Sequence, residues 1–168
     1  MAISMYSASV PVFTRMLGHL AAWLDKAEAH AQAKKFDASV YLAARLAPDM
    51  LPLPKQIQIA CDAAKFGVAR LAGVEAPKFD DNEASLAELR ERIRKTVEFV
   101  RAVPAAAIEG TEDKDITVPR RDGNVVLEGE FYLKHYVQPN FYFHVTTAYA
   151  LLRHAGVDIG KTDFLGKP

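Results

Sequence analysis

His144 is the residue of this 168-residue chain best placed to do chemistry. An imidazole is neutral near pH 7 and can accept a proton or bind a metal ion through either ring nitrogen. At about 100° per residue, the helical pattern around His144 places Val137, Ala148 and Leu151 on its face. The side chain is therefore predicted to point into an apolar core, where it needs a hydrogen-bond partner.

Two polar neighbours accompany His144 in this pattern. Asn140 lies one helical turn earlier and is predicted to share its face, and Thr147 flanks it. Polar residues on an apolar seam are either a satisfied structural network or part of a binding site. Asn140 and Thr147 are therefore candidates for lining a pocket, and both interpretations stay open at this point.

Two further candidates precede or begin the second predicted helix. Asp49 fits a helix N-cap or a loop anchor. If Asp49 instead reaches His144, the two would form a dyad capable of proton transfer, so both are candidate catalytic residues. Gln56 is a third pocket candidate, and its amide oxygen is a possible ligand atom.

The five histidines do not form a recognisable metal motif. His19 and His30 share a helix face but lie about 16 Å apart along the axis, too far to share one ion. His135 and His144 point to opposite sides of a continuous helix, and His154 lies in its last turn. We therefore expect no metal site and no cofactor. A divalent metal remains the alternative, and His144 would then be its ligand.

Composition and charge exclude several classes of protein. The formal net charge is zero, and the basic residues at 90–101 alternate with glutamates, so nucleic-acid binding is not expected. No run reaches the ~18 apolar residues that a membrane span requires, and residues 1–13 do not resemble a signal peptide. A lone cysteine, Cys61, suits a reducing compartment and lies on an apolar stripe. We expect a cytoplasmic protein.

Helical periodicity marks four long segments of one domain spanning residues 1–168. They begin at Ser9 or Pro11, at Pro54, near Asn82 and at Gly129, and the last contains Pro139, which is expected to kink or divide it. Four amphipathic helices bury one another's apolar stripes most simply as a bundle. The predicted fold is all-α.

Two shorter features complete the prediction. Residues 116–118 and 125–127 have the pattern of a small β-hairpin inserted before the last long helix, and residues 37–47 suit a short helix. The second long helix also carries Ile59 and Phe66 nearly opposite its main apolar stripe. A helix that is apolar on two sides touches two partners, either the short helix or another subunit. We therefore expect a homodimer.

Three stretches of the chain resemble a bacterial family of unknown function: residues 139–156, residues 46–50 with Gln56, and residues 160–166. The resemblance covers essentially the whole chain. That family is similar to the DinB/YfiT-like superfamily of four-helix bundles, which are often dimers. The resemblance implies a DinB-like four-helix bundle with a hairpin insertion.

The superfamily's metal motif has two histidines four residues apart on the last helix and a third on the second helix. Aligned on this motif, His144 takes the second position, Asn140 takes the first, and the second helix has no histidine. The resemblance therefore implies a degenerate site in a dimeric binding or stress-related protein, with a possible small-molecule ligand. The alternative is a metal-dependent enzyme, similar to the thiol transferases or isomerases of the superfamily, that uses His144.

Overall fold

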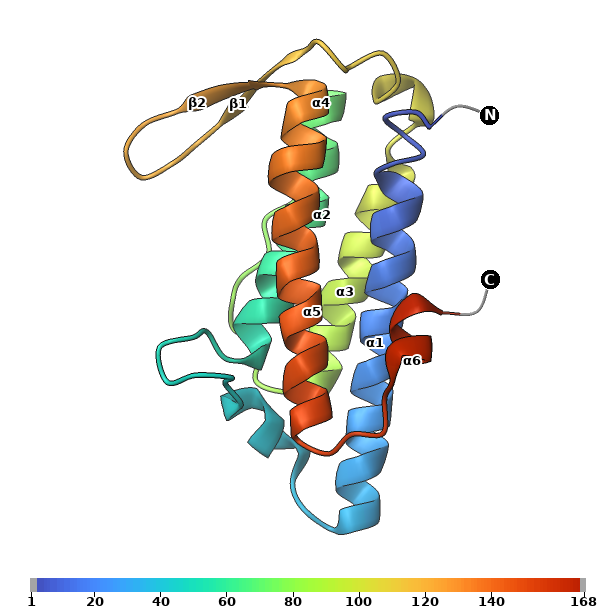
Figure 1. Cartoon of the computed structure of the whole chain (residues 1–168), viewed down its shortest axis with the longest axis vertical. Coiled ribbons are helices and arrows are strands. Elements are labelled where there is room, and N and C mark those ends of the chain that lie inside the picture. The colour runs from blue at the N-terminus through green and yellow to red at the C-terminus, as the bar shows by residue number, and fades with distance from the viewer. Residues whose placement is uncertain (1–2, 167–168) are drawn as a thin grey trace.

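The computed structural model describes residues 3–166 and confirms a four-helix bundle with a small hairpin (Figure 1). Its long helices are α1 (Val10–Lys34), α2 (Leu53–Ala72), α3 (Leu86–Ala102) and α5 (Gln138–His154). Helices α1 and α5 run in one direction and α2 and α3 in the other. The ends of the domain predicted over residues 1–168 lie outside the described residues.

Each long helix packs mainly against two others. Helix α2 lies against α3 and α5, and α1 lies against the same two, so α1 and α2 face each other across the diagonal. The short helix expected at residues 37–47 is the 3₁₀ helix η1 (Ala38–Ala43), which links α1 to α2 and contacts α1, α2 and α3. Four apolar stripes therefore meet along one central axis.

Prolines, caps and a glycine mark the ends of the long helices. Helix α1 starts after Ser9 with Pro11 in its first turn, and α2 ends at Gly73 in the left-handed conformation that glycine favours. Before α3, the Ser85 hydroxyl accepts a hydrogen bond from the Glu88 N–H at 3.1 Å. The Glu88 carboxylate accepts in turn from the N–H of Ala84. This pattern is close to a capping box.

The connection from α2 to α3 runs back along the bundle. Near its end, Asp81 pairs with Lys55 at 2.9 Å and Glu83 accepts from Gln58 at 2.7 Å, both in the first turns of α2. Helix α3 therefore starts beside the start of α2, which makes the two helices parallel (Figure 1). A short turn between them would have made them antiparallel.

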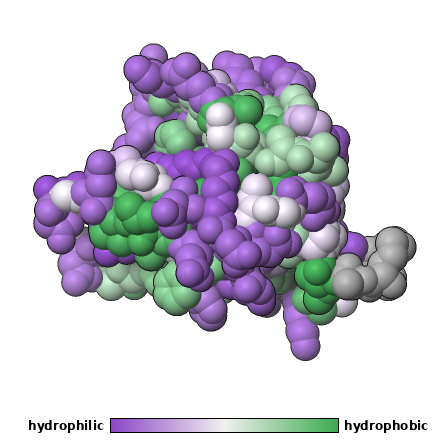
Figure 2. Space-filling model, turned by 90° about the horizontal axis from the view of Figure 1, so that it is seen from above, coloured by the Kyte–Doolittle hydropathy of each residue, from purple (hydrophilic) through white to green (hydrophobic). Residues whose placement is uncertain are grey.

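The predicted hairpin joins β1 (Asp115–Val118) to β2 (Val125–Glu128), antiparallel with Val118 opposite Val125. Seen from this end of the molecule, the surface is largely hydrophilic with hydrophobic residues between (Figure 2). The short helix α6 (Lys161–Leu165) follows α5 and lies against α1.

The last long helical run starts at Gly129, as predicted, but Pro139 neither ends nor divides it. The chain passes from α4 (Gly129–Phe131) through a π-helical turn, η3 (Tyr132–Val137), into α5 without a break. Proline has no N–H to donate to the preceding turn, and the irregular hydrogen bonding falls in the π-helical turn just before it. The predicted kink is therefore replaced by a wider turn.

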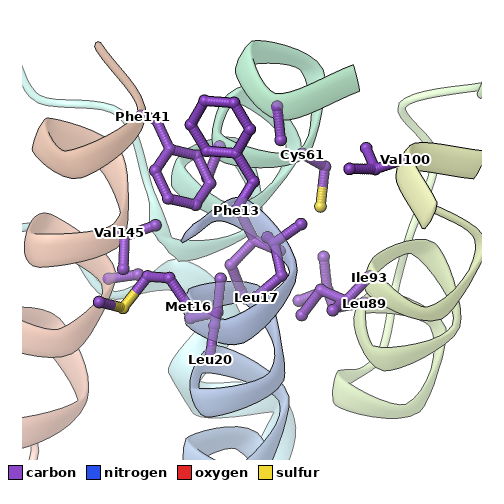
Figure 3. Close-up of a cluster of buried hydrophobic side chains, with 14 of the residues drawn as sticks. Phe13, Met16, Leu17, Leu20, Cys61, Leu89, Ile93, Val100, Phe141 and Val145 are labelled. Atoms are coloured by element: carbon purple, nitrogen blue, oxygen red, sulfur yellow. The ribbon is translucent and has the colours of Figure 1, made fainter. Parts of the chain in front are cut away.

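All four long helices contribute side chains to the core (Figure 3). The rings of Phe13 and Phe141 meet edge to face at 4.9 Å between α1 and α5. Cys61 is fully buried, and this burial raises the pKa of its thiol to about 12, so it packs as an inert apolar group. No helix among residues 3–166 is long and apolar enough to cross a membrane.

Candidate functional site

His144 is buried where α5 packs against α2, as the sequence predicts. Its Nδ1 lies 2.7 Å from Oε1 of Gln56, which is itself buried on α2. The other end of the Gln56 amide donates from Nε2 to the backbone carbonyl of Leu51 at 2.9 Å. A chain of two hydrogen bonds therefore links His144 to the start of α2.

This chain sets the protonation pattern of the imidazole. The carbonyl of Leu51 can only accept, so the Gln56 NH₂ must face it and the amide oxygen must face His144. Nδ1 of His144 is then the donor, and in the neutral ring Nε2 carries the lone pair. Burial lowers the pKa of His144, so the neutral ring is favoured near pH 7.

Asn140 is exposed, so the prediction that it shares the buried seam with His144 is wrong. The buried side of α5 is centred near Ala148, and His144 lies about 40° from this centre. At about 100° per residue, Asn140 lies about 80° from Ala148, toward the margin of that side. Its amide faces a pocket near the hairpin, described below.

The other two candidates do not join His144. Asp49 is exposed in a turn, and the residue at the N-cap position of α2 is Pro52, so the first of the two interpretations of Asp49, a helix N-cap, is wrong. Within residues 3–166, no hydrogen bond joins Asp49 to His144. The Thr147 hydroxyl donates to the carbonyl of Phe143 in its own helix, at 2.7 Å. Of the candidates Asp49, Gln56, Asn140 and Thr147, only Gln56 hydrogen-bonds the imidazole.

The remaining histidines are not arranged around His144. His19 hydrogen-bonds the carbonyl of Phe164 at 3.0 Å, and His30 hydrogen-bonds the Tyr41 hydroxyl at 2.6 Å, so both hold local structure. His135 and His154 are exposed. In the described part of the chain, no three His, Cys, Asp or Glu side chains are grouped so that they could hold a metal ion.

The donors near His144 do not fit the superfamily's metal site. One imidazole is present, the oxygen of Gln56 is already engaged by Nδ1–H, and Asn140 offers a neutral, exposed amide. Zinc affinity depends on several imidazole or anionic ligands in fixed geometry. We therefore assign no metal to these residues.

A pocket of about 200 Å³ opens beside Asn140, between α2, the hairpin, η3 and α5. We call it the hairpin pocket. Its lining residues are Ile59, Asp62, Ala63, Phe66, Arg70, Val118, Pro119, Tyr132, Tyr136, Val137 and Asn140. Ile59 and Phe66 thus face the hairpin and η3, and not η1, which was one of the two partners that their pattern suggested. The apolar second side of α2 is one wall of a pocket.

Arg70 and Tyr132 form the polar wall of the hairpin pocket. The Arg70 guanidinium donates to the Tyr132 hydroxyl at 3.1 Å, and this hydroxyl donates to the carbonyl of Phe66 at 3.3 Å. Burial raises the pKa of Tyr132, so the phenol keeps its proton. The ring of Tyr136 stacks on Tyr132, with 5.8 Å between centroids.

Arg70, Tyr132 and Tyr136 are not among the site residues predicted from the sequence. The two tyrosines are four residues apart, a spacing typical of one helix face, and most such pairs belong to a core. What makes them part of a pocket is the hairpin, which places Val118 and Pro119 opposite them. That contact is not visible in any local pattern.

Asp62, also in this pocket, belongs to a buried charge network. One of its oxygens lies 3.0 Å from Lys65 and 3.2 Å from the buried Arg92, which also pairs with Glu83 at 2.9 Å. Desolvation would raise the pKa of Glu83, but hydrogen bonds from Arg92 and Gln58 outweigh it and lower that pKa. These charges are paired with one another and hold the α2–α3 connection.

Similar proteins place the chain in a family. The model of a family described as Domain of unknown function (DUF1993) matches residues 5–165. The crystal structure of a DinB family member protein from Shewanella denitrificans is 46% identical, with a TM-score of 0.91, and the match covers 97% of this chain and 92% of that one. No curated protein matches. The chain thus belongs to this family of unknown function, DUF1993, within the DinB-like superfamily.

Proposed function

We propose that this protein is a dimeric binding module whose DinB-type site has lost its metal. The observation that carries this proposal is the hydrogen bond between His144 and Gln56. Gln56, an amide on α2, satisfies the single imidazole of the site, and Asn140 stands at the other motif position. A neutral, hydrogen-bonded imidazole of this kind acts as a structural group between two helices.

Metal analysis of the full chain, purified without a histidine tag, tests this proposal. We expect less than about 0.1 equivalent of any transition metal. Zinc, nickel or manganese should leave the Tm unchanged, whereas a metal that binds only the folded state would raise the Tm. A stoichiometric metal that is lost in His144→Ala would overturn the proposal.

A metal-dependent transferase or isomerase is the second candidate. It is favoured by one observation: no described residue hydrogen-bonds Nε2 of His144, while Nδ1 is held by Gln56. Proteins orient metal-binding histidines in a similar way, through a bond to the other ring nitrogen. The same metal analysis separates the two candidates. The stress-related role and the cytoplasmic location stay predictions.

An apolar hollow on α5 supports the dimer. It is lined by Leu46, Tyr142, Phe143, Thr146, Thr147 and Ala150 and has a volume of about 400 Å³. The side chains of Phe143 and Leu46 are 56% and 45% exposed. Exposed apolar side chains that cluster in this way are typical of surfaces that bind a partner protein. We propose that a second copy of the chain covers this hollow.

A further inference from the structure

The hairpin pocket carries positive charge that no carboxylate balances. Arg70 is half-buried, donates to the neutral Tyr132 hydroxyl and lies over the ring of Phe66 at 5.1 Å. At the pocket's edge, the Arg120 guanidinium lies over the ring of Tyr136 at 5.5 Å. Neither arginine forms an ion pair with any described residue.

The other sheltered cations among residues 3–166 are paired. Arg90 contacts Glu28 at 2.7 Å and Asp25 at 3.3 Å, and the buried Arg92 contacts three carboxylates. Asp62 is the one carboxylate among the residues that line the hairpin pocket, and it already pairs with Lys65 and Arg92. Partial desolvation of a cation without a counter-charge costs free energy, and an anion bound to Arg70 would offset this cost.

Size and wall chemistry narrow the class of anion. At about 30 Å³ for each water-sized unit, a pocket of about 200 Å³ has room for roughly seven such units, the size of a small organic molecule. Ile59, Val118 and Val137 provide apolar walls, which an inorganic anion would not use. The amide of Asn140 makes no hydrogen bond to a described residue and stands at the rim.

We propose that the hairpin pocket binds a small organic carboxylate. Arg70, held in place by Tyr132, receives the carboxylate through its remaining N–H groups, as guanidinium groups commonly do. The apolar body of the ligand lies against Ile59 and Val137, and Asn140 hydrogen-bonds a polar atom at the rim. This inference rests on the proposed binding function and names the class of its ligand.

Titration of the ¹⁵N-labelled full chain with benzoate, followed by amide NMR shifts, tests the inference. We expect saturable shifts at α2, the hairpin and η3, and about tenfold or greater weakening with benzamide, a neutral analogue of the same shape. Arg70→Gln should weaken benzoate binding to a similar degree. Arg101→Gln, which removes the same charge from the exposed end of α3, should leave it unchanged.

Tyr132→Phe is a second variant, for the case that Arg70→Gln does not fold. It keeps the ring and removes only the hydroxyl that holds Arg70, so benzoate affinity should fall several-fold. Equal binding of benzamide and benzoate, unchanged affinity in either variant, or no shifts in the pocket with benzoate would overturn the inference. Each of these results leaves the proposed function standing, because the results that would contradict it are a stoichiometric metal at His144 and a protein that is monomeric in solution.

Discussion

At the scale of single residues, the bond between His144 and Gln56 determines what the imidazole can do. The Leu51 carbonyl orients the Gln56 amide, and the amide directs the proton to Nδ1. His144 is therefore a buried group whose partner is an uncharged side chain. Such a group stabilises the fold through a satisfied hydrogen bond, and its loss leaves Gln56 with a buried, unpaired oxygen.

His144→Ala is expected to lower the free energy of unfolding by about 1–3 kcal/mol, the cost of a lost buried hydrogen bond and its unsatisfied partner. Urea denaturation at pH 7.5 measures this change. His135→Ala, at an exposed position before α5, is the matched control and should stay within about 0.5 kcal/mol of the wild type. Full stability of His144→Ala would contradict the structural role.

The same residue predicts a dependence of stability on pH. Burial lowers the pKa of His144 in the folded state, whereas in the unfolded chain this pKa is near 6.5. Between the two values the unfolded chain binds more protons, so the free energy of unfolding falls as the pH drops from about 7 through the folded-state pKa. Denaturation curves at several pH values should show a smaller decrease in His144→Gln.

At the scale of secondary-structure elements, close backbone contacts hold together the base of the hairpin, where β2 leads into α4 and the chain approaches β1. Gly129 joins β2 to α4, and a Cβ atom added there would lie 1.9 Å from the carbonyl oxygen of Thr111. The next residue, Glu130, donates its N–H to the carbonyl of Glu112 at 2.8 Å. Because the hairpin forms one wall of the pocket, this contact also maintains the pocket.

Gly129→Ala is therefore expected to destabilise the protein by about 1–3 kcal/mol or more, because the backbone of Thr111 must move. Thermal denaturation followed by circular dichroism measures the loss. Gly18→Ala is the control: it lies within α1 with open space around it, and should raise stability by about 0.5–1 kcal/mol through helix propensity. A neutral Gly129→Ala would show that the hairpin is not held by this contact.

At the scale of the whole molecule, the bundle presents two different surfaces along α5. The hairpin pocket, with Arg70 on one wall, lies toward the end that carries the hairpin, and the apolar hollow around Phe143 lies toward η1 and the start of α2. Separate positions allow a ligand and a second subunit to bind without competing. The two proposals are therefore independent in their tests.

Phe143→Glu is expected to convert the dimer into a monomer, because a buried carboxylate in an apolar interface lacks a partner. Light scattering coupled to size-exclusion chromatography gives the mass of each variant. Phe131→Glu is the matched control, since that ring is also half-exposed but lies at the hairpin end, and should stay dimeric. A wild-type protein that is monomeric at all concentrations would contradict the proposed dimer.

The sequence by itself determined the elements of this protein and the burial of His144. Apolar stripes, Ser85 and Gly73 mark the long helices, because local patterns and caps depend on neighbouring residues. The resemblance to a family identified the bundle and the missing metal ligands.

Only the tertiary structure decided which polar groups meet. It paired His144 with Gln56, 88 positions earlier, turned Asn140 outward and placed the hairpin opposite Arg70 and Tyr132. Such contacts depend on how helices are rotated and on how long loops return. Contacts between residues far apart in the chain determine the helix rotations and the loop paths, so local sequence patterns do not predict them.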